Sequence, residues 1–561
     1  MIIGLDVGGT HADVVLLGDG GLVKEIKVLT DPADLFQTVL SSLEEITAGI
    51  DPHSIQRIVL STTLATNAIA QGKIPPVGMI VSGGPGIDPE FYRTNPHYFP
   101  VSGSIDHRGR EIVPVDEREI RSIAETLKKE GIRHVGVISK FSVRNPQHEI
   151  QICGILTDIF ERVFMGHQVS GSLNFSRRIA TTYLNAAVYP IHRNFFQAVK
   201  LSLEKKGLQV PIHILKADGG TMNLEASMQF PGQTILSGPA ASVMGSIAFS
   251  PSEAEAMSLD IGGTTTDMAV ISNRVPLLHP IGIRLGGYRT LIRSLETRSI
   301  GIGGDSTVKI RNGTLEIGPE RDGPAMAYGG VVPTPTDALF VLNRVNNGDR
   351  EKAIRGIQSV ADGLGVSLKD AAEKVFDYAC RRILDHARAM VDRINNRPVY
   401  TVQDIQEGSR VNPKVLLILG GPAPYFAAHI EKISDFKVQV VPRWQVANAI
   451  GAALARTTCE VTLFADTQLG IAVAPEEGFK DSVGPDFSDS DAVDSAYKLL
   501  GQKALQIGAN TRDLQMEVIE VQQFNMVRGF LTTGKNIRIK AQVKPGLIQG
   551  YESVLTKLDN C

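Results

Sequence analysis

Two stretches of the chain carry the same order of acidic, glycine and hydroxyl residues. Residues 6–13 and residues 260–267 both read Asp-x-Gly-Gly-Thr-x-x-Asp. An apolar run leads into each stretch, and another follows it, from Val14 to Leu17 and from Met268 to Ile271. Glycine tips between apolar strands predict one β-hairpin in each half of the chain.

The residue types at these two tips suit the phosphates of a nucleotide. Paired glycines let backbone N–H groups approach phosphate oxygens closely, and threonine adds a hydroxyl donor. An aspartate at the end of the leading strand can hold Mg²⁺, because this ion prefers oxygen ligands and keeps several waters. Two ordinary glycine turns are the alternative, but repetition of the whole pattern favours a phosphate clamp.

The composition indicates a globular protein without a nucleic-acid or membrane partner. With 561 residues, 43% hydrophobic and 21% charged, the chain is expected to form about three domains. Its formal charge of −3 gives no reason to expect nucleic acid or an anionic membrane as partner. The four cysteines are far apart, so neither a disulfide framework nor a zinc site is expected. No signal peptide or membrane-spanning run is recognisable, which predicts a cytoplasmic protein.

Apolar periodicity predicts an α/β fold in which polar or glycine-rich segments follow the strands. A strand over residues 58–61 leads into a polar loop at residues 62–68, and a strand over residues 212–216 leads to Asp218. A helix of small residues opens at Ser237, just before the second hairpin. Ligands of α/β folds bind beside the carboxyl ends of strands, so we expect these segments to line a site.

The later part of the chain adds a third glycine loop, a long helix and a β-rich end. The loop covers residues 299–306, and Ser367 is expected to cap the long helix, with Asp370 three residues on. A strand over residues 415–419 ends in a Gly-Gly-Pro turn. From about Glu460 the sequence alternates, with one helix near residues 492–508, which predicts a separate C-terminal domain.

Together, these elements resemble the actin, sugar kinase and Hsp70 ATPase superfamily. Seven sequence motifs further resemble the hydantoinase A/oxoprolinase family, in its order, over about residues 1–455. They are Gly8-Gly9-Thr10-x-x-Asp13, Ser61-Thr62-Thr63-x-Ala65-Thr66-Asn67-Ala68, Asn145-Pro146-x-His148-Glu149, Leu236-Ser237-Gly238-Pro239-Ala240-Ala241, Asp260-x-Gly262-Gly263-Thr264-x-Thr266-Asp267, Ser299-Ile300-Gly301-x-Gly303-Gly304 and Thr336-Asp337-Ala338.

The resemblance implies an α/β fold with two ribonuclease H-like lobes, of the actin, hexokinase and Hsp70 type, around a nucleotide cleft. A small C-terminal α+β domain would follow. We place the N-terminal hydantoinase/oxoprolinase lobe at residues 1–175 and the second lobe, with the hydantoinase A ATPase core, at residues 176–457. The β-rich C-terminal domain would cover residues 458–561.

The family also implies a chemistry. Its members use ATP to activate the carbonyl oxygen of a cyclic amide, such as a hydantoin or 5-oxoproline, or of a ketone awaiting carboxylation. The resemblance therefore implies an ATP-dependent cyclic amide hydrolase with ATP and Mg²⁺ as cofactors. A B subunit or B-like region commonly completes the reaction, and the stretch after Ala455 is too short to be one. We therefore expect a hydantoinase B-like partner subunit; a homo-oligomer stays open.

Carried over to this chain, the family pattern assigns roles to the glycine turns. Asp6 and Asp260 would organise Mg²⁺, whereas Asp13 and Asp267 would either contact the metal or a water, or stiffen the hairpins. All four are our catalytic candidates. The phosphates would be held by Gly8, Gly9, Thr10, Gly262, Gly263, Thr264 and Thr265. The turn of Gly420, Gly421 and Pro422 would lie against the adenosine, with a simple strand exit as the alternative.

The candidates for contacting the substrate are polar residues after glycines or strand ends: Thr63, Asn67, Asp218 and Asp305. For Thr63 and Asn67 the alternative is hydrogen bonding within their own loop. Three departures from the family pattern bear on the substrate. His11 stands where an aromatic residue is usual, Asp305 replaces a usual third glycine, and residues 321–326 lack the usual Cys-containing loop.

Other functions within and beyond this superfamily stay open. A nucleotide-switched activator or binding protein would use ATP hydrolysis to drive domain motion, although the scattered cysteines provide no set for an iron–sulfur cluster. A small-molecule kinase and a ketone carboxylase subunit are further alternatives. A P-loop enzyme is not expected, because no Gly-x-x-x-x-Gly-Lys-Ser/Thr occurs.

Overall fold

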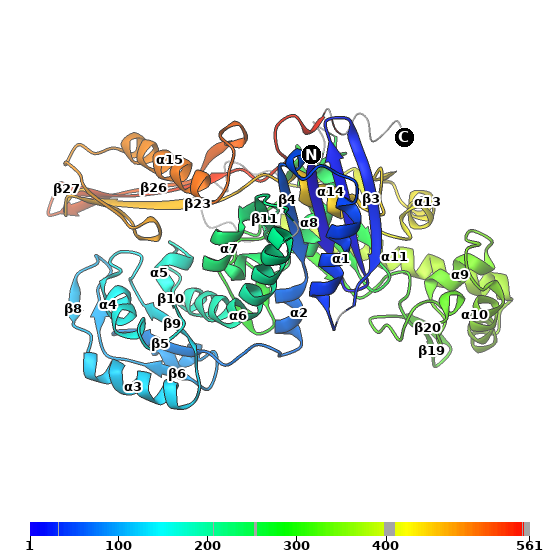
Figure 1. Ribbon diagram of the computed structural model, residues 1–561, viewed down its shortest axis with the longest axis horizontal. Coiled ribbons are helices and arrows are strands. Elements are labelled where there is room, and N and C mark those ends of the chain that lie inside the picture. Colours follow the sequence, from blue (N-terminus) through cyan, green and yellow to red (C-terminus); the bar gives the residue numbers. More distant parts are fainter. Residues whose placement is uncertain (32, 206, 252–254, 398–409, 553, 555–561) are drawn as a thin grey trace.

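The computed structural model describes the chain except residues 32, 206, 252–254, 398–409, 553 and 555–561, which are grey in Figure 1. Two six-stranded sheets form its centre. The first has the order β12-β11-β4-β1-β2-β3. Its strands are β1 (Ile2–Val7), β2 (His11–Gly18), β3 (Gly21–Leu29), β4 (Arg57–Thr62), β11 (Ile212–Leu215) and β12 (Thr221–Asn223).

The second sheet has the order β15-β14-β13-β21-β22, and β18 also pairs with β14. Its strands are β13 (Glu255–Ile261), β14 (Thr266–Ser272), β15 (Val275–Pro276), β18 (Thr297–Ile300), β21 (Val415–Leu419) and β22 (Lys437–Val440). In each sheet an antiparallel hairpin, β1–β2 or β13–β14, continues into two parallel strands, β4 and β11 or β21 and β22. This shared topology confirms the predicted α/β class with two similarly built lobes.

Two helices of small residues lie between the sheets. They are α8 (Ser237–Ile247) and α14 (Ala447–Leu454), and their side chains share one apolar core with both sheets. A Cβ at Gly245 would lie 2.1 Å from the backbone oxygen of Ala447, and one at Gly4 would lie 2.2 Å from that of Ala449. Only glycine permits these close approaches, which bring α14 against both α8 and β1.

The outer faces of the sheets are covered by longer helices. On the first sheet these are α1 (Leu35–Thr47) and α6 (Phe175–Lys205). On the second they are α9 (Pro335–Val341), α10 (Arg350–Leu364), α11 (Leu368–Asn395) and α13 (Ala423–Ile433). Ser367 caps α11 as predicted, since its hydroxyl accepts a hydrogen bond from the backbone N–H of Asp370 at 3.1 Å.

Two further bodies extend from the centre (Figure 1). Between β4 and α6 the chain forms a four-stranded sheet, β10-β9-β5-β6, with α3 and α4 beside it. Its elements are α2 (Leu64–Ala70), β5 (Gly78–Ser82), β6 (Tyr98–Pro100), β7 (Ser104–Ile105), β8 (Glu111–Val113), α3 (Glu117–Lys129), β9 (His134–Ser139), α4 (Gln147–Leu156), β10 (Arg162–Met165) and α5 (Gly166–Val169).

The C-terminal body is a five-stranded antiparallel sheet that carries α15. Its elements are β23 (Glu460–Asp466), β24 (Ile471–Ala474), β25 (Phe479–Ser482), α15 (Asp489–Gln506), β26 (Met516–Arg528) and β27 (Leu531–Val543). The remaining short helices and strands of the described residues are α7 (Leu224–Gln229), β16 (Arg284–Leu285), β17 (Tyr288–Arg289), β19 (Val308–Arg311) and β20 (Thr314–Ile317). The described 3₁₀ turns are η1 (Pro52–Ser54), η2 (Pro89–Tyr92), η3 (Pro231–Thr234), η4 (Met326–Tyr328), η5 (Pro475–Glu477) and η6 (Thr511–Asp513).

The three domain ranges inferred from the sequence stay predictions. Sheet pairing adds one fact: β11 and β12 follow residue 176 in the chain but lie in the first sheet. None of the helices in the described part of the chain combines the length and apolar character that crossing a bilayer requires.

Candidate functional site

The two glycine hairpins have the same local geometry. Strand pairing places Asp6 directly opposite Asp13 in the first hairpin and Asp260 directly opposite Asp267 in the second. The turns close in the same way, because the N–H of Gly8 donates to His11 O at 3.0 Å and the N–H of Gly262 donates to Thr265 O at 2.9 Å. The repeated sequence pattern therefore forms a repeated structure.

Each leading aspartate is held by one of the two central helices. Asn448 on α14 donates a hydrogen bond of 2.8 Å to Asp6, and Ser242 on α8 donates one of 2.5 Å to Asp260. Burial, reinforced by the charges of Asp13 and Asp260, raises the pKa of Asp6 to about 7. Burial also raises the pKa of Asp260. The two hairpins therefore bring their acids close enough to repel one another.

The second acids of the hairpins differ in their surroundings. Asp13 accepts a hydrogen bond of 2.6 Å from Lys27, which also donates to the backbone oxygen of Gln445. Asp267 is partly exposed, and burial followed by the charge of Asp260 raises its pKa to about 7. The ion pair gives Asp13 a side-chain partner on β3 that neither of our two alternatives named, and its role stays a prediction.

The geometry of Asp6 and Asp260 suits a hydrated cation. The buried Oδ1 atom of Asp6 has no hydrogen-bond partner among the described residues. A cation between the two acids would supply that partner and would favour the charged forms that burial, above all, disfavours in both carboxyls. No group of three or more His, Cys, Asp or Glu side chains arranged to bind a metal lies within the described residues. Two carboxylates, of which Asp6 has an unpartnered oxygen, fit an Mg²⁺ ion that keeps several of its waters.

The third glycine loop lies directly against the second hairpin. The N–H groups of Gly304 and Asp305 donate to the backbone oxygens of Gly262 (2.9 Å) and Gly263 (2.7 Å). A Cβ at Gly303 would lie 2.5 Å from the oxygen of Gly262, so the contact requires glycine. The Asp305 side chain consequently stands beside Gly263, at the predicted phosphate position.

Our sequence reasoning did not assign Arg321 to the site, nor did it assign Asn448, Ser242 or Lys27, which bond to the acids. The Arg321 guanidinium donates to Asp305 at 3.1 Å, and it is close enough to His11 to help lower the pKa of that imidazole, whose main cause is burial. Arg321 therefore reaches toward both hairpins from the Gly- and Pro-rich stretch before α9. The only sequence signal was an arginine within that poorly periodic loop.

The turn after β21 contacts Asp260. Gly420 has a φ of +95°, and a Cβ there would lie 2.2 Å from Ile261 O and 2.6 Å from Asp260 Oδ1. A Cβ at Gly421, by contrast, would meet open space. Pro422 follows as the N-cap of α13. The predicted adenosine turn is thus adjacent to the second hairpin.

Thr63 and Asn67 lie beside the first hairpin and bond to each other. The amide of Asn67 donates to the Thr63 hydroxyl at 3.1 Å, and that hydroxyl donates to Val7 O at 3.4 Å. The polar loop predicted at residues 62–68 was wrong, because α2 begins at Leu64 with Thr63 at its N-cap. At the start of α2 the N–H of Leu64 donates to the Thr62 hydroxyl at 2.9 Å, and the N–H of Asn67 makes the first helical bond, to Thr63 O at 2.8 Å.

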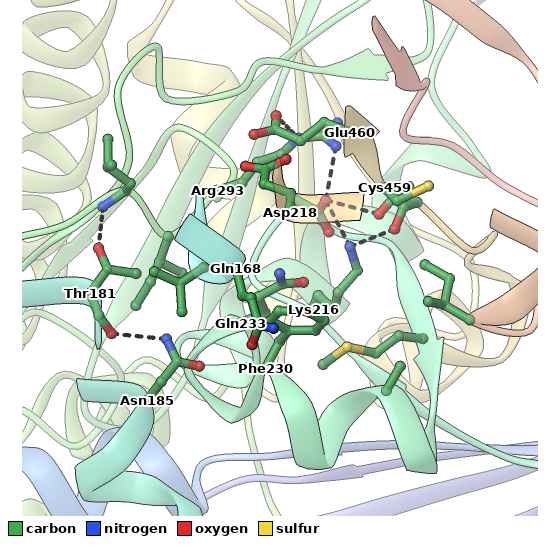
Figure 2. A pocket seen from close by; sticks show the side chains of 18 of the residues that line it. Gln168, Thr181, Asn185, Lys216, Asp218, Phe230, Gln233, Arg293, Cys459 and Glu460 are labelled. Carbon is green, nitrogen blue, oxygen red and sulfur yellow. Dashed lines mark hydrogen bonds and ion pairs between the residues drawn. The ribbon is translucent and has the colours of Figure 1, made fainter. Parts of the chain in front are cut away.

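Asp218 lies apart from both hairpins, in a buried ionic cluster (Figure 2). It accepts hydrogen bonds from Lys216 Nζ (3.2 Å) and the Thr458 hydroxyl (2.8 Å), and pairs with Arg293 at 3.5 Å. Burial acts to raise the pKa of Asp218, but the charges of Lys216 and Arg293 lower it below its ordinary value. Thr63, Asn67 and Asp305 flank the hairpins, whereas Asp218 contacts a different cavity.

Comparisons with known proteins give a consistent family. The model described as Hydantoinase/oxoprolinase matches residues 178–461, and that of the Hydantoinase/oxoprolinase N-terminal region matches residues 2–160. Caprolactamase subunit alpha of Pseudomonas jessenii is 24% identical over 66% of this chain and 60% of its own length. Acetophenone carboxylase gamma subunit of Aromatoleum aromaticum is 27% identical over 81% of this chain and 67% of its own.

A solved structure agrees in fold. The ATP-dependent caprolactamase from Pseudomonas jessenii superimposes with a TM-score of 0.72 at 20% identity, covering 98% of this chain and 88% of that chain. In the sequence comparison, the chain spans less than two thirds of the caprolactamase subunit.

Proposed function

Because the chain belongs to the hydantoinase/oxoprolinase family, we propose that it is an ATP-dependent enzyme subunit that activates the carbonyl group of a small amide or ketone. We favour a cyclic amide such as a hydantoin or 5-oxoproline, and hence a hydrolase. The observation that carries the proposal is the pair of glycine hairpins with the same sequence pattern, in each of which the leading acid accepts a hydrogen bond from one of the two central helices.

In this proposal the hairpins bind the phosphates of ATP from two sides. The backbone N–H groups and hydroxyls of Gly8, Gly9 and Thr10 face those of Gly262, Gly263, Thr264 and Thr265. Bound ATP would supply the phosphoryl group that makes the carbonyl oxygen a leaving group, and Mg²⁺ on Asp6 and Asp260 would offset the phosphate charge. Phosphoryl transfer needs mainly positioning and charge neutralisation, so no His or Cys nucleophile is required.

The remaining residues orient the two ligands. Gly420, Gly421 and Pro422 would lie against the adenosine, where Gly421 leaves open space. Arg321 would add a positive charge between the hairpins. Thr63 and Asn67, which flank Gly8, and Asp305, which flanks Gly263, would contact the substrate carbonyl. Asp13 would stiffen the first hairpin through Lys27.

A partner subunit would complete the reaction. Both relatives described above are named as subunits, alpha or gamma, of their enzymes. Here the β26–β27 hairpin carries exposed large apolar side chains: Phe524, Val527, Phe530 and Leu531. Such a patch indicates a protein contact. We propose that a hydantoinase B-like subunit covers it. Size-exclusion chromatography with that subunit tests this, and Phe530→Ser with Leu531→Ser should abolish co-elution without changing ATP binding.

The experiment that tests the function is ADP release by the purified chain with Mg-ATP, alone and with a panel of hydantoins, 5-oxoproline, other lactams and simple ketones. Stimulation by lactams supports the hydrolase, and stimulation by ketones alone supports the carboxylase alternative, which the 27% identity to the acetophenone carboxylase subunit favours. If the chain binds ATP but no compound stimulates ADP release, even with the B-like subunit present, both enzyme proposals fail and a nucleotide-switched activator replaces them. A stable phosphorylated product would identify a kinase.

A further inference from the structure

A separate internal cavity of about 60 Å³ lies beside the end of β11 (Figure 2). Its walls come from α6, from the turn after β11, from Arg293 and from the C-terminal body, where β23 and α15 contribute Glu460 and Lys503. Since one water needs about 10–15 Å³ by this measure, the space takes about five water-sized groups, the size of a small organic acid.

The charged side chains around this cavity do not balance. Asp218 pairs with both Lys216 and Arg293. Glu460 pairs with Lys540 at 2.9 Å and, at the longer distance of 3.9 Å, with Arg293, and Glu477 pairs with Lys503 at 2.5 Å. The cations are Lys216, Arg293 and Lys503 in the lining and Lys540 outside it, and the carboxylates that pair with them are Asp218 and Glu460 in the lining and Glu477 outside it. One positive charge therefore has no carboxylate of its own.

A further carboxyl group in the wall does not supply the missing charge. Glu476 lines the cavity, and burial raises its pKa to about 8. At neutral pH it is therefore protonated and presents an O–H donor. The cavity thus stays short of one negative charge.

Arg293 is the cation with free hydrogen-bonding capacity. Its Nη2 donates to Gln542 Oε1 at 2.8 Å. Its Nε and Nη1 are buried and make no hydrogen bond among the described residues, because the carboxylates that they face, Glu460 and Asp218, stay 3.9 Å and 3.5 Å away. Leaving buried donors unpaired is costly, and a guanidinium matches a carboxylate well. An anion in the cavity would satisfy both the charge and these donors.

The facing wall is polar and uncharged. The Asn185 side chain already has hydrogen-bond partners within the protein, because it donates to Thr181 O and accepts from the N–H of Gly232, both at 2.9 Å. Gln233 also lines the cavity, near the centre of Figure 2. Within the described residues, its side-chain carboxamide has no hydrogen-bond partner. It can both donate to and accept from an amide or hydroxyl group.

We propose that this cavity binds a small monocarboxylate that also carries an amide or hydroxyl group, with its carboxylate on Arg293 and its second polar group on Gln233. The site is distinct from the hairpins. The strands β1, β4 and β11 are parallel neighbours ending at one sheet edge, so the turn after β11 lies two strand spacings, roughly 10 Å, from Gly8. The ligand is either a substrate or an effector of the nucleotide site.

Calorimetry on the full chain tests the proposal with N-acetylglycine as the probe. N-ethylacetamide lacks its carboxylate, and acetate lacks its amide. We expect N-acetylglycine to bind at least about tenfold more tightly than either, and Arg293→Gln to remove that advantage. Equal binding of N-ethylacetamide, no binding of N-acetylglycine, or wild-type binding by a folded Arg293→Gln variant would each overturn the proposal.

Two further variants guard against misfolding and against confusion with the nucleotide site. Glu476→Gln keeps a neutral donor and should retain binding, whereas Gln233→Leu should lose the preference over acetate. If Arg293→Gln does not fold, Gln233→Leu decides: the proposal is overturned if this variant still binds N-acetylglycine more tightly than acetate. Gly263→Val should lose ATP binding but still bind N-acetylglycine. The proposed carboxylate site can therefore be tested even if the proposed ATP site is wrong. If N-acetylglycine accelerates ADP release, the natural ligand resembles a substrate. If N-acetylglycine binds without accelerating ADP release, the natural ligand is an effector.

Discussion

Asn448 Nδ2 donates a hydrogen bond of 2.8 Å to Asp6 Oδ2, although 442 positions separate the two residues. The contact exists because α14 packs against β1, where Gly4 allows the backbone of Ala449 to approach. The other carboxylate oxygen of Asp6 is buried without a partner. The helix α14 thus holds Asp6 through one carboxylate oxygen and leaves the other oxygen free to bind a ligand.

Asp6→Asn should abolish Mg-ATP turnover and stabilise the nucleotide-free protein. The pKa of Asp6 is raised to about 7 in the folded chain, so the folded state holds its proton more tightly than the unfolded state, whose value is 3.8. Stability is therefore lost as pH rises from about 4 to about 7. The variant should gain on the order of 1–4 kcal/mol at pH 8, by chemical denaturation.

The pH provides the control for this prediction. At pH 4 the carboxyl of Asp6 is protonated in the folded wild type, so the stability advantage of Asp6→Asn should disappear. A constant advantage at all pH values, or turnover within a factor of two of wild type, would contradict the assigned role of Asp6.

Gly9→Ala and Gly421→Ala should each weaken ATP binding without disturbing the fold. A Cβ at either position meets no atom within 4 Å, and neither glycine has a positive φ. The added methyl would enter the space we assign to the phosphates or the adenosine, so we expect a loss of at least about tenfold in affinity. Gly20→Ala, equally open but in the β2–β3 turn, is the matched control. The ATP affinity of the three folded variants is measured by calorimetry. An unchanged affinity in Gly9→Ala and Gly421→Ala would contradict the proposed phosphate clamp.

Arg321→Gln should lower kcat for ATP turnover by about 10²-fold, with a smaller change in KM. Arg321 donates to Asp305, beside the second hairpin, and in the proposed function its positive charge would stabilise the charge that develops during phosphoryl transfer. Arg311→Gln is the control, because Arg311 sits on the exposed β19–β20 hairpin and pairs with Glu316. Equal activities of the two variants in steady-state kinetics would mean that Arg321 has only a surface role.

His192→Asn should flatten the acid side of the stability profile. His192 is buried against Ser227, and burial lowers its pKa to about 3, whereas the unfolded value is 6.5. Its contribution is therefore complete above pH 6.5 and is lost as pH falls toward 3. Between pH 6.5 and pH 5 the wild type should lose about 2 kcal/mol through this group.

The measurement is urea denaturation at pH 7 and pH 5 for wild type, His192→Asn and His53→Asn, the last on an exposed turn. Absolute stability will also drop in the first variant because His192 packs on Phe196. Only the pH dependence tests the prediction, and an unchanged slope in His192→Asn would refute it.

Local patterns could be predicted from the sequence because neighbouring residues generate them. The hairpins at residues 6–13 and 260–267, the Ser367 cap and the family resemblance all depend on short-range order, and all are confirmed as structure or family. The loop that we predicted after β4 was wrong, because the polar residues at 62–68 suit a loop and a short helix equally well. Packing in the folded chain selected the helix α2.

The sequence by itself determined the α/β class, the two hairpins and the family, because these follow from periodicity, glycine spacing and ordered motifs. Only the tertiary structure decided which distant residues complete each site. Asn448 and Ser242 reach the acids through helix packing, Arg321 reaches the hairpins from a loop without periodicity, and Asp218 joins Arg293 in another cavity. Such contacts depend on how the sheets and helices pack against one another, and no short stretch of sequence encodes that arrangement.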